Sequence, residues 1–137
     1  MSAGTDNSDA LNLTGVWHGL YSYPRARESV PFTASLTDGG GWLSGTTEEV
    51  PTSGKAKGLT LVATLQGRRT GHSVTFLKTY DDLRYGYDAV QYAGAVNQDG
   101  SEIEGRWTIP GVWSGKFLMI RAGAVQASLF RDVAERV

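Results

Sequence analysis

Apolar and polar residues alternate along most of the chain, the pattern of β-strands that bury one face. Eight segments have this period of two: residues 11–23, 30–37, 42–49, 59–66, 73–80, 87–96, 102–109 and 114–121. No helix-length stretch separates them, which argues against parallel crossovers, and three links are short and rich in glycine or aspartate, as in hairpins. Glycines inside the strands permit the coiling that barrel closure needs. The sequence therefore predicts an all-β domain over residues 11–121, an eight-stranded antiparallel up-and-down β-barrel.

The two ends of the chain lack this alternation. Residues 1–10 are small and polar without the pattern of a signal peptide, so we expect a disordered lead. Residues 122–137 are predicted to form a short amphipathic C-terminal helix, because apolar residues recur there at helical spacing with charges between them. Its apolar stripe (Val125, Leu129, Phe130, Val133, Val137) must cover the barrel wall, an open end or a neighbouring subunit.

Composition removes several classes of partner. The 137 residues suit one domain, and 13 basic against 14 acidic side chains leave a net charge of −1, which favours neither nucleic acid nor an anionic membrane. No window approaches the roughly 20 apolar residues of a membrane-spanning helix. Cysteine is absent, and His18 and His72 are too few for a histidine metal site. We therefore expect a cytoplasmic protein without a metal or cofactor.

The first strand carries the segment Leu13-Thr14-Gly15-Val16-Trp17, and a late strand repeats Gly-x-Trp as Gly105-Arg106-Trp107. This pattern resembles the calycin superfamily, and within it the avidin-like barrels more than the lipocalins. The resemblance implies a barrel closed at one end by Trp17 and hollow enough for a small ligand. Avidins hold biotin with an asparagine two residues after the first tryptophan and a serine slightly further on. Gly19 and Tyr23 stand at those places, so biotin is not the expected ligand.

Strand parity selects residues that face the interior. If Trp17 points inward, Tyr21 and Tyr23 do as well, either leaving a polar-lined space or filling the core with their hydroxyls at a rim. Trp107 belongs to the apolar face of its strand. The candidate ligand-binding residues are Trp17, Tyr21, Tyr23, Lys78, Tyr80, Trp107 and Phe117.

Lys78 stands out because it shares a face with Phe76 and Tyr80. If that face is exterior, Lys78 is simply solvated. If it is interior, the ammonium needs an acidic partner, which the Glu48–Glu49 pair or Asp81 can supply. Of the two glutamates, Glu49 is the better inward candidate, unless both are solvated acids at the strand end. An interior Lys78 and Glu49 would anchor a polar ligand group or transfer a proton.

Three functions are compatible with these residues. The first is a binding barrel for a small, mainly apolar molecule with one or two polar groups. The second is a cofactor-free isomerase or cyclase with Glu49 or Lys78 as the proton-transfer group, since the usual nucleophile, phosphate-loop and zinc-protease motifs are missing. The third is a non-catalytic homo-oligomeric assembly module. Val16, His18 and Leu20 form an apolar outward strip that, with the terminal helix, favours a homo-oligomer, most economically a dimer.

Overall fold

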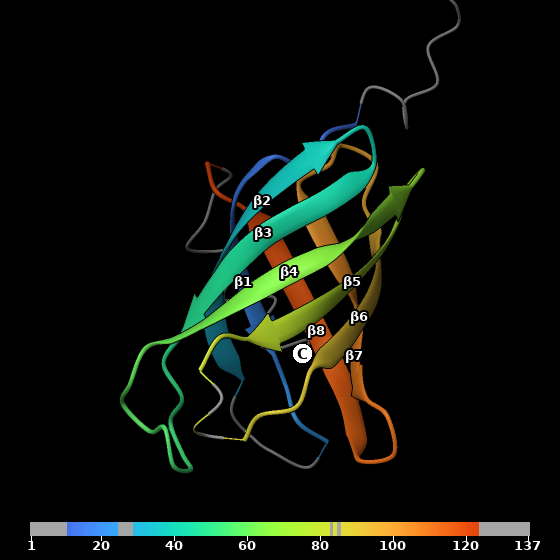
Figure 1. Cartoon of the computed structure of the whole chain (residues 1–137). Helices are drawn as coiled ribbons and strands as arrows, with labels where there is room; N and C mark the ends of the chain where they lie inside the picture. The colour runs from blue at the N-terminus through green and yellow to red at the C-terminus, as the bar shows by residue number, and fades with distance from the viewer. Residues whose placement is uncertain (1–10, 25–28, 83, 85, 124–137) are drawn as a thin grey trace, which may run out of the picture.

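The computed structural model describes residues 11–24, 29–82, 84 and 86–123. Eight strands form one closed barrel in sequence order, each antiparallel to its neighbours, with the last strand pairing with the first (Figure 1). The predicted all-β, eight-stranded up-and-down barrel is confirmed. The strands are β1 (Gly15–Tyr21), β2 (Val30–Gly39), β3 (Trp42–Glu49), β4 (Leu61–Thr70), β5 (Ser73–Tyr80), β6 (Val90–Val96), β7 (Glu102–Ile109) and β8 (Trp113–Arg121).

Three strands, β3, β5 and β7, have the predicted bounds, and the others differ at their ends. The differences are largest in β1, which begins at Gly15 instead of residue 11, and in β4, which ends at Thr70 instead of residue 66. Before β1, the Leu13 N–H bonds the side-chain carboxylate of Asp38 on β2 and not a backbone carbonyl. Ala122 and Gly123 form a turn after β8. The rest of the predicted C-terminal helix, residues 124–137, and the predicted lead, residues 1–10, lie outside the described residues.

The two ends of the barrel differ in their connections. Tight turns join β2 to β3, β4 to β5 and β6 to β7 at one end (Figure 1). The other end carries the remaining connections, of which residues 50–60 and 81–89 are the two longest. Tight turns leave little room for additional structure, whereas long loops supply side chains around an opening.

Trp17 fills the tight-turn end. Its indole is fully buried, and Nε1 donates a hydrogen bond to the carbonyl of Leu13 at 3.0 Å. The guanidinium of Arg121 lies 4.6 Å from the ring centroid and bonds the carbonyls of Asn12 and Thr14. The segment before β1 is thus held across the barrel end over the tryptophan.

The buried carboxylate of Asp38 also connects chain segments at this end. It accepts hydrogen bonds from the N–H groups of Leu13 (3.0 Å) and Gly41 (2.8 Å) and from Nε of Arg69 (2.8 Å). Burial alone would raise the pKa of Asp38, but these hydrogen bonds and the charge of Arg69 outweigh burial and lower it. The carboxylate therefore ties three separate segments together in its charged form.

The outer wall near β1 and β8 differs in part from expectation. Val16 is exposed at 42%, but Leu20, expected on the same exposed strip, is only 5% exposed although it faces outward. Leu118, its partner on β8, is also buried. Less apolar surface is therefore exposed here than the oligomer argument assumed, and the homo-oligomer stays a prediction.

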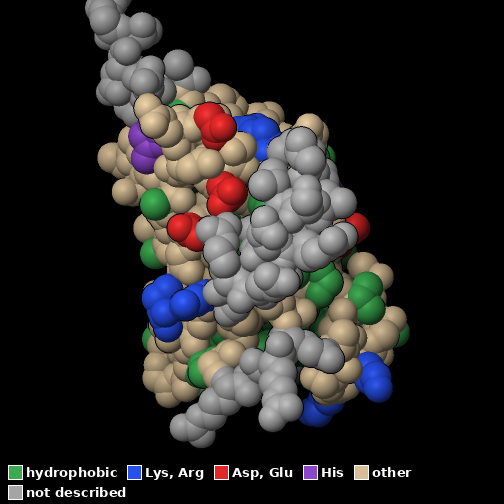
Figure 2. Space-filling model, turned by 180° about the vertical axis from the view of Figure 1, so that it is seen from behind, with side chains coloured by type: hydrophobic (Ala, Val, Ile, Leu, Met, Phe, Trp, Pro, Cys, Tyr) green, Lys and Arg blue, Asp and Glu red, His purple; other side chains and the backbone are tan. Residues whose placement is uncertain are grey.

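On the face seen from behind, uncovered hydrophobic side chains occur in small separate groups, with acidic and basic side chains between them (Figure 2). The described residues contain no helix of the length and apolar character needed to span a bilayer.

We predict that Trp17→Ala lowers the free energy of unfolding by about 3–5 kcal/mol, because it removes a fully buried indole from the closed end. Urea denaturation followed by circular dichroism measures the loss. The control is Trp42→Ala, at a tryptophan 64% exposed on β3, which should change stability by less than about 1 kcal/mol. A loss for Trp17→Ala as small as that of the control would contradict the assignment of Trp17 as the plug.

Asp38 predicts a pH dependence of stability. Because its pKa is lower in the folded protein than in the unfolded chain, its contribution is present above about pH 4 and is lost as the pH falls through the folded-state pKa. Asp38→Asn should therefore unfold more easily than wild type at pH 7, with the difference shrinking toward pH 3. Urea midpoints at both pH values measure this. A difference independent of pH would mean that the charge of Asp38 does not fasten this end.

Candidate functional site

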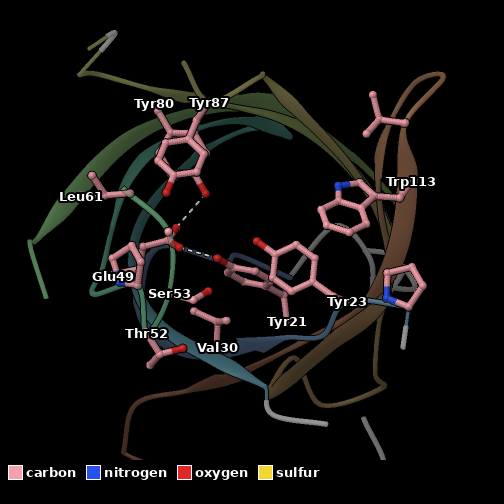
Figure 3. A pocket seen from close by; sticks show the side chains of 14 residues that line it. Tyr21, Tyr23, Val30, Glu49, Thr52, Ser53, Leu61, Tyr80, Tyr87 and Trp113 are labelled. Carbon is pink, nitrogen blue, oxygen red and sulfur yellow. Dashed lines mark hydrogen bonds between the residues drawn. The ribbon is translucent and has the colours of Figure 1, made fainter. Parts of the chain in front are cut away.

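A cavity of about 710 Å³ opens at the long-loop end of the barrel (Figure 3). Its inner part is lined by strand residues, and its mouth by the loops after β3, β5 and β7. The lining residues are Tyr21, Tyr23, Pro24, Val30, Glu49, Pro51, Thr52, Ser53, Gly54, Leu61, Tyr80, Tyr87, Val112 and Trp113. A smaller space of about 210 Å³ shares several of these side chains and reaches Tyr92, Trp107 and Ile109. The volume is in the range that holds a small organic molecule.

Aromatic rings form much of the cavity wall. Tyr23 packs against Trp113, with centroids 4.9 Å apart, and against Trp107 at 5.4 Å. On the opposite side, Tyr80 and Tyr87 lie 5.1 Å apart (Figure 3). These rings give the cavity flat apolar surfaces.

Trp107 is held in place by two features of the neighbouring chain. Its Nε1 donates to the carbonyl of Ser22 at 2.8 Å, and its ring lies over Gly115 on β8. A Cβ atom at Gly115 would lie 2.0 Å from the Ser22 carbonyl oxygen and 2.6 Å from Trp107 Nε1, so only glycine fits. The glycine thus allows β8 to approach the β1–β2 connection beside the cavity.

Glu49, at the end of β3, carries the one carboxylate found among the residues that line the larger cavity. The residue is 4% exposed, and its two oxygens accept three hydrogen bonds. Oε1 accepts from Lys78 Nζ at 2.6 Å and from the Tyr80 hydroxyl at 3.0 Å, and Oε2 accepts from the Tyr21 hydroxyl. The expectation that Glu49 faces inward is confirmed, and its interpretation as a solvated strand-end acid is wrong.

Lys78 lies inside the barrel on β5 and is 1% exposed, so its interpretation as a solvated exterior lysine is wrong. Its register brings it into the interior opposite Leu65 on β4 and Val90 on β6. Four rings surround Nζ, with centroids at 4.8 Å (Tyr80), 5.1 Å (Tyr21), 5.4 Å (Phe32) and 5.9 Å (Tyr92). The ammonium is stabilised by one carboxylate and by the faces of these aromatic rings.

The protonation states of this network follow from its contacts. Burial favours a neutral Lys78, but its contacts with Tyr80 and Glu49 outweigh burial and raise the pKa of Lys78. Burial, together with the nearby Glu49, raises the pKa of Tyr21 far above that of an ordinary phenol. Burial also raises the pKa of Tyr80, despite the opposing effect of Lys78. At neutral pH the lysine is an ammonium and both tyrosines keep their protons.

The structure brings together several of the predicted site residues. Tyr21, Tyr23 and Tyr80 line the larger cavity with Glu49, and Trp107 lines the adjoining space. Lys78 contacts Glu49 but is not among the residues that line the larger cavity. Trp17 and Phe117 belong to the packed core and line neither of these spaces.

Sequence reasoning did not select two loop residues of the cavity, Ser53 and Tyr87, or Trp113, the first residue of β8. A signal was available, because the two longer connections, after β3 and after β5, fall at the same end of an up-and-down barrel. Strand periodicity says nothing about side chains in loops.

One buried polar atom has no hydrogen-bond partner among the described residues, Oγ1 of Thr47, which lies two positions before Glu49 on β3. No buried polar side-chain atom of the Glu49 network lacks a hydrogen-bond partner. The described residues contain no group of three or more His, Cys, Asp or Glu side chains arranged to hold a metal ion.

No protein-family model matches this chain, and no match was found among the curated proteins or the solved structures.

We predict that the buried ion pair behaves as a unit. Glu49→Gln and Lys78→Met should each lower the free energy of unfolding by about 3–5 kcal/mol, because each leaves one buried charge unpaired. The double variant removes both charges and should lie within about 1–2 kcal/mol of wild type.

Urea denaturation of all four proteins gives the coupling energy. The exposed Asp82–Arg84 pair supplies the comparison, since Asp82→Asn should leave the unfolding midpoint nearly unchanged. Additive losses in the Glu49/Lys78 double variant would contradict the ion pair.

Proposed function

We propose that this protein is a small-molecule-binding barrel whose ligand enters at the long-loop end and is mainly apolar, with one or two polar groups. The observation that carries the proposal is the cavity of about 710 Å³, with aromatic walls and a carboxylate, Glu49, among its inner residues. Apolar walls with a few fixed polar groups are typical of small-ligand sites.

We propose further that the barrel is of the calycin kind and closest to the avidin-like members. The support is the closed eight-stranded up-and-down topology together with a buried Gly-x-Trp tryptophan at the end of the barrel opposite the cavity. The ligand differs from biotin. A Cβ atom at Gly19 would lie 2.1 Å from the ring of Phe32, so this ring takes the space where avidins have their asparagine.

The geometry favours binding over the cofactor-free isomerase or cyclase. A general base takes up a proton from a substrate group that lies within hydrogen-bond reach. Glu49 instead already accepts three hydrogen bonds, one of them from a charged ammonium, and the remaining position on Oε2 suits a ligand donor. Lys78 has no access to the larger cavity from which to donate a proton.

Binding can be tested with N-phenyl-1-naphthylamine, a neutral, mainly aromatic probe whose fluorescence increases in apolar surroundings. We predict saturable binding in the micromolar range, with energy transfer from Trp113, and no displacement by biotin. Ser53→Trp places a large ring at the mouth and should weaken binding at least tenfold.

The matched control is Ser44→Trp, the same substitution at an exposed serine on the outer face of β3, which should bind the probe like wild type. If wild type does not bind the probe, or if both variants bind it as tightly as wild type does, the cavity is not the binding site.

A further inference from the structure

Three hydrogen bonds of the Glu49 network, at the inner end of the cavity, have the carboxylate as acceptor. A neutral tyrosine hydroxyl has one hydrogen to donate and two lone pairs to accept with. Tyr21 and Tyr80 both donate their single hydrogen to Glu49. What each hydroxyl has left is its capacity to accept.

Glu49 itself is an acceptor without a hydrogen to offer. An ionised carboxylate has about four lone-pair positions. Lys78 and Tyr80 bond Oε1, whereas Tyr21 alone bonds Oε2. One position on Oε2 is therefore left for a donor in the cavity, which Glu49 lines.

Lys78 is the strongest donor nearby, but its hydrogens are directed elsewhere. Its side chain is 1% exposed and does not line the larger cavity. One hydrogen bonds Glu49, and the rings of Tyr80 and Tyr21 lie around the rest of the ammonium. A ligand with only acceptors would meet no donor from this network.

The charge of the ion pair also restricts the ligand. Lys78 neutralises Glu49 through Oε1, 2.6 Å away, so the inner end of the cavity carries a carboxylate without a net charge. A cationic ligand at Oε2 would lie close to the ammonium and be repelled by it. A neutral donor receives the hydrogen bond without that repulsion.

We propose that the ligand is a neutral, mainly aromatic or apolar molecule that inserts a hydroxyl or N–H group, as a hydrogen-bond donor, against Oε2 of Glu49. This inference rests on the proposed binding function and narrows its ligand to a chemical class: phenols, alcohols or neutral N–H compounds, and not ethers, esters or carboxylates. Tyr23 and Trp113 would contact the rest of the molecule.

Two probes of nearly equal shape test the donor directly. 2-Naphthol carries a hydroxyl that 2-methoxynaphthalene replaces with a methyl ether, and both fluoresce. We expect wild type to bind 2-naphthol at least about tenfold more tightly, the effect of one hydrogen bond to a charged acceptor. Equal affinities, or tighter binding of the ether, would overturn the inference. The proposed binding function would survive that result, since it is tested separately by N-phenyl-1-naphthylamine and the Ser53→Trp and Ser44→Trp variants.

Variants then locate the acceptor. The Glu49→Gln/Lys78→Met double variant should reduce the preference for 2-naphthol to less than about threefold, with the affinity for the ether nearly unchanged. The control is Glu48→Gln, at the adjacent exposed glutamate on the outer face, which should keep the wild-type preference. If the double variant does not fold, the comparison of the two probes in wild type still decides the inference. An unchanged preference in a folded Glu49 variant would mean that another group receives the hydroxyl.

Discussion

The ion pair between Lys78 and Glu49 is the constraint on which the interior of this barrel depends. Desolvating two charges is unfavourable, and their attraction compensates only if the geometry is good and the remaining hydrogen-bonding positions are filled. Tyr21 and Tyr80 fill two of those positions, and the rings around Nζ stabilise the ammonium. The pair also marks a boundary, since Trp17 and the core around it are packed, whereas the side of Glu49 that faces the long loops lines a cavity.

The two ends of the barrel divide stability and recognition between them. At the tight-turn end, Asp38 and Arg121 connect separate segments through backbone groups, which fixes Trp17 in place. At the other end, long connections contribute Ser53 and Tyr87 to the lining of the cavity. The loops at the cavity mouth lie at the opposite end of the strands from Asp38 and Arg121. Their sequence can therefore vary without removing the hydrogen bonds that close the tight-turn end.

Strand parity predicted much of the fold because the barrel buries one face of each strand, so a period of two has a direct physical cause. The inward positions of Trp17 and Tyr21 followed from it, and it favoured Glu49 as the inward glutamate without excluding a solvated acid at the strand end. Parity did not decide whether Lys78 points inward. Phe76 and Tyr80 on the same face indicate burial, whereas the ammonium of Lys78 indicates exposure to solvent. Its partner is 29 residues away in sequence, and only the register across β4 joins them. Loop residues such as Ser53 and Tyr87 have no period from which to infer them.

A buried ion pair is weak evidence for stability, because apolar side chains of similar volume often serve as well or better. Lys78 and Glu49 would therefore be an inefficient way merely to fill a barrel. Their arrangement makes sense if the carboxylate is the functional group and the lysine its counterion. Lys78 fixes the Glu49 carboxylate in place, offsets its charge, and bonds the oxygen that Tyr21 does not bond. The result is a strong acceptor presented to the cavity without the field of a free anion, and we infer that this is why a lysine stands in the core.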